Sequence, residues 1–416
     1  MQTKRKLRQS IGILLSLAAV LANYSPQTQA VRALPETLRV RAGETYAVSV
    51  GWPYSLEPSD VGAQVLSSSD ESVGVIGAQA GQTHLTVSLL GVPVKQVTVQ
   101  VDSEKILYPG GQSIGAALNT QGVLVVGLSE VDGERSASPG REAGLRAGDL
   151  LLSINGQSVL SAAQLTEMLA AQGASPLQVR YARRGEERET TVQAAQDALD
   201  GQWRLGLWVR DSTAGVGTLS FYDPQTQRYG ALGHAITDLD TGVTLPVREG
   251  SILRSSVVGI RRGERGTPGE LQGSFLRNPV TLGDIRLNNT FGIYGSAASP
   301  IVNPLYPQGL PVGSQASVHT GPASILTTLD DGGVREYGVE ITRVTRQEEA
   351  SPKSLTIRVT DPELLERTGG IVQGMSGSPI LQDGRIVGAV THVFVSDPTQ
   401  GYGVFIEWMM QQANSL

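Results

Sequence analysis

The chain has 416 residues, of which 40% are hydrophobic, and this is enough for two to four domains with buried cores. Its 50 glycines, 21 prolines and only 17% charged residues favour a protein that is mainly β and rich in turns. A formal net charge of −6 does not suggest a surface for nucleic acids, and the absence of cysteine excludes disulfides, a cysteine nucleophile and thiolate metal sites. We expect neither a metal nor a cofactor.

The first 34 residues have the pattern of an export signal. Four positive charges come first, on Lys4, Arg5, Lys6 and Arg8. An apolar run follows at residues 11–22, and residues 28–30 (TQA) offer a cleavage site. The run is shorter than the ~20 residues that a membrane span needs. We therefore expect a signal peptide, with a short uncleaved membrane anchor as the alternative.

Residues 35–104 are predicted to form a small β-rich domain. Short apolar runs alternate with polar residues, as in residues 97–101 (VTVQV). His84 lies in one of these runs and is expected to be an ordinary strand residue. This region carries no visible chemistry.

Residues 105–197 resemble a PDZ domain, an α+β fold. Residues 138–156 (SPGREAGLRAGDLLLSING) have the short helix, strand and Asn-Gly turn of that family. Ser161 and Gln164 form a capping box, which predicts a helix that ends at Gly173.

A peptide-binding loop is predicted upstream of this stretch, at Ile114, Gly115 and Ala116. Glycine at this point would let backbone N–H groups approach the carboxylate of a peptide. The peptide would add a strand between the loop's strand and the helix after Ser161. The alternative is a PDZ fold that serves as a spacer without a ligand.

Residues 374–379 (GMSGSP) present a serine in the way that trypsin-type folds present a nucleophile. Small residues let the backbone turn tightly, so that the N–H groups of Gly374 and Ser376 form an oxyanion hole. Asp383 and Gly384 follow between two apolar runs, which predicts a β-hairpin directly after the serine. A structural hairpin with an incidental serine is the alternative.

A serine nucleophile needs a general base, and the chain has only four histidines. His234 follows a glycine at the end of an apolar run and precedes Ser376 by the spacing of a two-barrel protease, so it is the first candidate. His392, on the strand after the Asp-Gly turn, is the second. For the third residue the spacing favours Asp284 over Asp361, although either aspartate could instead cap a turn or a helix.

These motifs resemble the stage IV sporulation protein B (SpoIVB) peptidase family. The resemblance rests on the order of signal segment, β region, PDZ domain and peptidase, and on four stretches, which are residues 233–235, 369–380, 391–395 and 401–409. It implies that residues 198–416 form a trypsin-like double β-barrel serine peptidase. The family's nucleophile and base fall on Ser376 and His234. Its acidic residue falls on Asp361, which therefore becomes the preferred third residue, with Asp284 as the alternative.

The resemblance also implies a biological role. Such a peptidase is exported to the space between the two forespore membranes, processes itself, and cleaves a membrane-associated regulator. That cut releases an intramembrane metalloprotease, which activates the late mother-cell sigma factor. The PDZ domain would hold the enzyme to itself and to its target. The rival interpretations are a non-catalytic PDZ scaffold on a protease-like fold, and a general secreted PDZ protease.

Overall fold

The computed structural model describes residues 24–43, 45–48, 50–59, 63–69, 72–77, 80–132, 136–275 and 280–416. Residues 4–22, with the charges and the apolar run of the predicted signal, lie outside these ranges. Among the helices that are described, none is long and apolar enough to cross a membrane. The chain forms two compact units, Met1–Ile106 with Pro311–His319, and Leu107–Leu310 with Thr320–Leu416.

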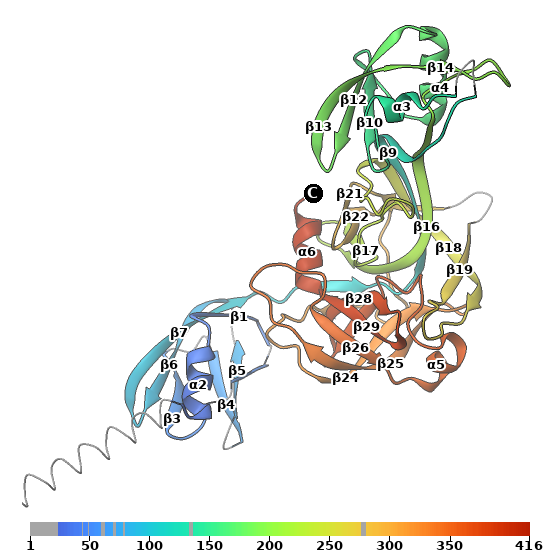
Figure 1. Cartoon of the computed structure of the whole chain (residues 1–416). Helices are drawn as coiled ribbons and strands as arrows, with labels where there is room; N and C mark the ends of the chain where they lie inside the picture. The colour runs from blue at the N-terminus through green and yellow to red at the C-terminus, as the bar shows by residue number, and fades with distance from the viewer. Residues whose placement is uncertain are drawn as a thin grey trace, which may run out of the picture. The chain divides into compact units, whose positions relative to one another are not determined.

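In its described residues, the first unit has two small sheets and one short helix (Figure 1). One sheet has the strand order β1-β7-β6-β3 and the other β2-β5-β4. Val87, Val97 and Val99 are buried because alternate side chains of β6 and β7 point to the same face. The elements are α2 (Pro26–Ala33), β1 (Thr37–Arg41), β2 (Thr45–Val48), β3 (Tyr54–Pro58), β4 (Ala63–Ser69), β5 (Ser72–Gly77), β6 (Gly81–Leu89) and β7 (Val92–Asp102).

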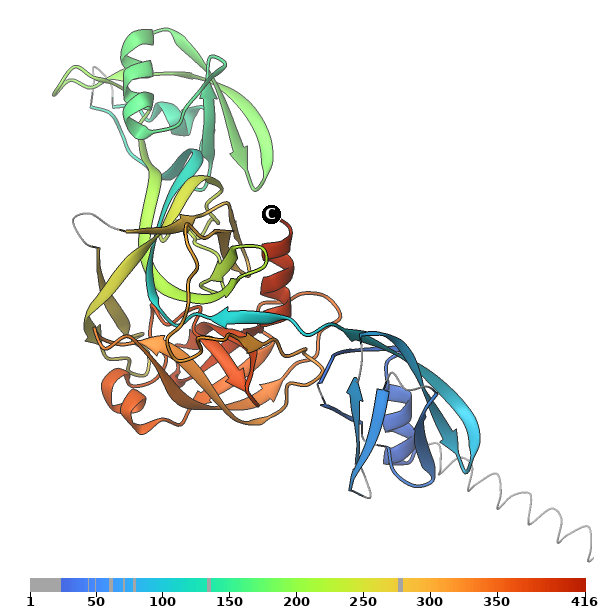
Figure 2. The ribbon, with the colours of Figure 1, turned by 180° about the vertical axis from the view of Figure 1, so that it is seen from behind.

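Two long strands run through the second unit, β9 (Ser113–Leu128) and β16 (Leu207–Asp223). They pair antiparallel, from Leu207 opposite Leu128 to Thr218 opposite Ser113 (Figure 2). One end of this ribbon belongs to the lobe expected to be a PDZ domain, and the other end belongs to the peptidase region. Its two strands therefore link the two parts.

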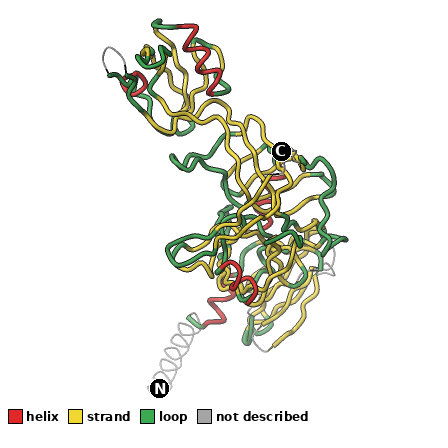
Figure 3. The backbone as a smooth tube through the Cα atoms, turned by 90° about the vertical axis from the view of Figure 1, so that its right-hand side faces the viewer, coloured by secondary structure: helices red, strands yellow, loops and turns green. Residues whose placement is uncertain are grey.

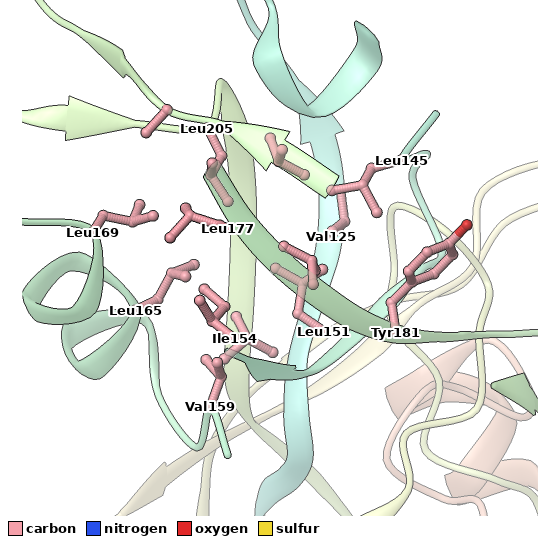
Figure 4. Close-up of a cluster of buried hydrophobic side chains, with 14 residues drawn as sticks. Val125, Leu145, Leu151, Ile154, Val159, Leu165, Leu169, Leu177, Tyr181 and Leu205 are labelled. Atoms are coloured by element: carbon pink, nitrogen blue, oxygen red, sulfur yellow. The ribbon is translucent and has the colours of Figure 1, made fainter. Parts of the chain in front are cut away.

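The lobe at the first end has a core of its own (Figure 4). Leu165 and Leu169 from the helix α4 pack against strand residues such as Ile154 and Leu177. The elements of this lobe are α3 (Pro139–Glu142), β10 (Leu150–Ile154), β11 (Gln157–Ser158), α4 (Ala162–Gln172), β12 (Pro176–Arg183), β13 (Glu186–Gln193), β14 (Ala195–Gln196) and β15 (Trp203–Arg204).

Strands around the second end of the ribbon form the first half of the peptidase region. The second half of β16 pairs with β17, which pairs with β22, while β9 also pairs with β18. The elements are β8 (Ile106–Pro109), β17 (Arg228–Ala231), β18 (Val247–Arg261), β19 (Glu270–Phe275), β20 (Thr281–Asp284), β21 (Leu287–Asn289), β22 (Gly292–Ser296) and β23 (Leu310–Pro311).

The second half is a closed barrel with the strand order β24-β25-β26-β29-β28-β27. Figure 3 shows how strands dominate the whole path of the backbone. The prediction of a mainly β chain is thus confirmed, and of the two barrels expected for residues 198–416 the described strands form one closed barrel. The elements are β24 (Gly321–Thr328), β25 (Val334–Val344), β26 (Leu355–Val359), α5 (Pro362–Thr368), β27 (Pro379–Gln382), β28 (Arg385–Phe394), β29 (Asp397–Phe405) and α6 (Ile406–Asn414).

The sequence predicts a PDZ domain at residues 105–197 followed by a peptidase domain at residues 198–416, whereas in the structure the two share strands. Residues 114–120 of β9 already belong to the peptidase sheet, because they pair with β18. The expected border at residues 197/198 lies between β14 and β15, which pair with each other. The lobe is therefore inserted into the first half of the peptidase region.

Candidate active site

The serine loop, residues 369–378, connects α5 to β27. Four glycines of positive φ shape it, and two of them flank Ser376, Gly374 with φ 95° and Gly377 with φ 96°. A Cβ on Gly377 would lie 2.1 Å from the carbonyl oxygen of Thr218 and 2.5 Å from the backbone nitrogen of Leu232. Only glycine therefore lets the loop pack this closely against the first half of the peptidase region.

Hydrogen bonds from Thr218 on β16 fix the backbone at Gly374 and Ser376, the predicted nucleophile. The Thr218 backbone N–H donates to the carbonyl of Ser376 at 3.0 Å, and its hydroxyl donates to the carbonyl of Gly374 at 2.7 Å. In the part of the chain that the structure describes, the N–H groups of Gly374 and Ser376 donate no hydrogen bond. These two amides are the predicted oxyanion donors, and they remain available to a substrate.

The hydroxyl of Ser376 is half-buried and donates to the carbonyl of Thr391 on β28 at 2.8 Å. The hairpin predicted after the serine is present as β27 and β28. Its turn residues Asp383 and Gly384 have φ values of 51° and 71°, as a type I′ turn requires.

The histidine loop, residues 232–246, connects β17 to β18 and begins with two residues of positive φ, Leu232 at 71° and Gly233 at 70°. A Cβ on Gly233 would lie 3.0 Å from both the Thr391 Cγ2 atom and the Val390 carbonyl oxygen. The residue before His234 thus packs on the same segment of β28 that accepts the hydrogen bond of Ser376. The structure therefore brings the predicted base and nucleophile to one junction, although no hydrogen bond joins these two described residues.

His234 lies with His392 in a pair of imidazoles whose ring centroids are 5.1 Å apart. The Nδ1 atom of His234 is 2.8 Å from the carbonyl oxygen of Ala235, so Nδ1 carries the proton and Nε2 is free to accept one. Burial lowers the pKa of His234, against the opposing effect of the Ala235 carbonyl. Burial, the charge of His234 and the charge of Lys353 lower the pKa of His392. At neutral pH His234 is therefore in its neutral, proton-accepting form.

Neither predicted acidic residue hydrogen-bonds His234 in the described structure. Asp361 is the N-cap of α5, where its Oδ1 accepts from the Leu364 N–H at 3.0 Å. Asp284 accepts from the Ser296 N–H at 2.6 Å and from Arg286 Nε at 2.7 Å. The place that a triad carboxylate would take at Nδ1 is occupied by the Ala235 carbonyl, a main-chain contact that no sequence pattern indicates.

The peptide-binding loop predicted at Ile114, Gly115 and Ala116 is not a loop. These residues lie within β9, where they pair with β16 on one side and β18 on the other. Ile114 and Ala116 are buried in the core of the first half of the peptidase region. The prediction is wrong because a glycine in a paired, buried strand cannot offer its N–H to a peptide.

A different strand borders the helix α4. The helix packs beside β15 and the start of β16, just after Gly206, which has φ 65°. The predicted capping box is confirmed, since the Gln164 N–H donates to Ser161 Oγ at 3.1 Å. The sequence interpretation missed Asp211, whose Oδ2 accepts from the Ala162 N–H at 2.8 Å.

Comparisons with known proteins decide the family. The model of the SpoIVB peptidase S55 family matches residues 201–410, and a PDZ domain model matches residues 130–183. The chain belongs to the SpoIVB peptidase family. It is thus a sporulation serine peptidase with a PDZ domain, and the lobe around α4 is hereafter called the PDZ lobe.

Other comparisons add little. No curated protein matches the chain. Among solved structures, it is similar to the PDZ domain of an SdrC-like protein from Listeria monocytogenes, with 18% identity over 21% of this chain and 87% of that one, at a TM-score of 0.18. Among the described residues, no group of three or more His, Asp or Glu side chains could hold a metal ion.

Proposed function

We propose that this peptidase is an endopeptidase in which Ser376 is the nucleophile and His234 is the general base. The observation that supports the proposal is the junction at Thr391. Its carbonyl accepts the hydroxyl of Ser376, and its methyl group lies against Gly233, next to His234.

The reaction needs one rotation of the serine side chain. When the Ser376 hydroxyl turns from the Thr391 carbonyl to Nε2 of His234, the imidazole takes its proton as Oγ attacks the scissile carbonyl. The free N–H groups of Gly374 and Ser376 then stabilise the oxyanion. His234 returns the proton to the leaving amine, and water hydrolyses the acyl-enzyme by the same steps.

We propose a supporting role for Asp361, the acidic residue that the family resemblance indicates. As the N-cap of α5 it fixes the start of the helix that leads directly into the serine loop. The Ala235 carbonyl takes over the orientation of the imidazole. In this proposal Asp361 acts on the nucleophile side of the site, through the backbone.

Family membership supports a further part of the proposal. We propose export to the space between the forespore membranes, with the N-terminal segment as the signal or as a temporary anchor. Self-processing would come first, and the target would be a membrane-associated regulator of an intramembrane protease. A peptide terminus of the target or of another copy would bind beside α4 and the start of β16.

Labelling with a fluorophosphonate tests the catalytic proposal. We expect the full chain to be labelled at Ser376, as mapped by mass spectrometry, and Ser376→Ala to lose both labelling and self-cleavage. Ser378→Ala is the matched control, because Ser378 is buried in the same loop and should leave labelling intact. A folded chain that is never labelled would favour the non-catalytic scaffold.

A further inference from the structure

The histidine loop closes on itself shortly after His234. Its two sides are joined by a bridge between Thr237 and Thr244 and by a hydrogen bond from the Asp238 N–H to the Val243 carbonyl at 2.9 Å. Asn288 on β21 anchors the start of this loop, since its Oδ1 accepts from the Ile236 N–H at 2.8 Å. Because Ile236 is only two residues from His234, whatever moves this loop also moves the imidazole.

Apolar side chains of the histidine loop pack against the peptidase part and the PDZ-lobe part of β9, and against β10 of the PDZ lobe. Leu245 is buried with Leu118 and Leu124 of β9. Ile236 and Val243 from the loop, and Val126 and Leu150 from the lobe, lie around the same cluster. This contact lies between the part of the chain that carries the base and the part that resembles a peptide-binding module.

An ion pair reinforces the contact from β16. Arg210 binds both Asp238 and Asp240 of the histidine loop, with 2.8 Å between its Nη2 and Asp240 Oδ2. The Asp238 side chain is 0% exposed, and its Oδ1 accepts from the Asp240 N–H, the Thr241 N–H and the Thr241 hydroxyl. Because an unpaired buried carboxylate is costly, the shape of the loop depends on the guanidinium of Arg210.

The next residue of β16 holds the PDZ helix. Asp211 accepts from the Ala162 N–H at the start of α4, and its carbonyl accepts from the Thr120 hydroxyl at 3.2 Å. Asp211 lies at an irregularity in the pairing of β16 with β9, between Arg210 and Ser212. Arg210 binds the histidine loop while Asp211 binds the helix beside the proposed peptide site.

We propose that the PDZ lobe positions the general base, and that Arg210 is the positioning residue through which it does so. This inference rests on the proposed function, because it assumes that His234 is the base. Arg210 contacts no reacting atom in it. Its effect passes through Asp238 and the backbone of the histidine loop to the imidazole.

The test compares fluorophosphonate labelling of Arg210→Gln, Arg210→Lys and the unaltered full chain as a function of pH. Arg210→Gln should lower the labelling rate roughly tenfold or more, as expected when a reacting group is misplaced. Its pH midpoint should also move upward, because a displaced imidazole is less buried and its pKa returns toward the ordinary value. Arg210→Lys, which keeps one positive charge, should restore part of the rate and of the midpoint.

Arg204→Gln is the matched control. Arg204 is also an arginine of the PDZ lobe paired with two aspartates, Asp197 and Asp200, but it does not contact the histidine loop. Its replacement should change neither rate nor midpoint. If Arg210→Gln does not fold, Asp240→Asn decides, because it removes only the exposed partner and should still lower the rate a few-fold.

The outcomes separate the two proposals. If the unaltered chain is not labelled, the proposed function fails. If it is labelled and both Arg210→Gln and Asp240→Asn match it in rate and pH midpoint, the peptidase assignment stands and the positioning role of Arg210 is wrong. A lower rate with an unchanged midpoint would also contradict it, since that result means only fewer folded molecules.

Discussion

The two loops that meet at Thr391 are held in different ways. The serine loop is fixed mainly by backbone hydrogen bonds and by glycines whose Cβ atoms would clash with neighbouring backbone. The histidine loop is fixed by side chains from distant elements, which are Asn288, Arg210 and the apolar cluster around Leu245.

This difference indicates which of the two loops a regulatory change can move. A nucleophile held by its own backbone and by a closed barrel has a geometry that varies little. A base held by side chains of another lobe can be displaced by changes in that lobe without unfolding the barrel. Four predictions, in order of decreasing expected effect, test this difference between the serine loop and the histidine loop.

Removing the base should have the largest effect. His234→Ala should lower fluorophosphonate labelling and self-cleavage roughly 10⁴-fold or more, because losing a member of the catalytic unit disables it as a whole. His392→Ala, which removes the neighbouring imidazole, should cost less than about tenfold. Equal losses in the two variants would mean that the assignment of the base to His234 is wrong.

Gly377→Ala should destabilise the serine loop strongly. The added Cβ would overlap the Thr218 carbonyl in a backbone conformation that alanine rarely adopts, at a cost of about 3 kcal/mol or more. Thermal unfolding measures the loss. Gly384→Ala is the control, because the same kind of residue there meets no neighbouring atom. A Gly377→Ala protein as stable as this control would contradict the packing described for the loop.

Replacements of Asp361 separate a helix cap from a triad acid. Asp361→Ala should cost about 1 kcal/mol of stability and lower activity moderately, whereas Asp361→Asn should keep both, because asparagine caps a helix as well as aspartate does. A triad acid would instead lose roughly 10⁴-fold in rate as asparagine. Labelling rates of the two variants therefore decide between the roles, and Asp284→Asn tests the alternative residue in the same assay.

The pH dependence should show the smallest change. Protonated His234 cannot accept the proton of Ser376, so labelling falls as pH drops through its pKa. Because burial lowers that pKa, half-maximal labelling should lie below the ordinary histidine value of about 6.5. A midpoint at or above 6.5 in the unaltered chain would indicate that the imidazole is not buried as described.

Much of the local structure could be predicted from the sequence. The β-hairpin at Asp383 and Gly384, the capping box at Ser161 and the glycine stop at Gly173 depend on neighbouring residues, and each is present. The pairing of His234 with Ser376, which the family resemblance and the spacing indicate, stays a prediction, and the contact of Gly233 with the Thr391 segment agrees with it. The role of residues 114–116 could not be predicted, because a glycine in a loop and a glycine in a buried strand look alike until the partner strands are known.

The turns around the proposed nucleophile follow from the local sequence, because glycine permits their positive φ values, although Thr218 of β16 also holds this backbone. The contacts around His234, in contrast, depend on the tertiary structure. Its Nδ1 donates to the main-chain carbonyl of Ala235. Asp361 caps the helix α5, and Arg210 joins the histidine loop to the PDZ lobe. The physical reason is that these contacts depend on how β9 and β16 pair over a long separation in sequence, which no local pattern encodes.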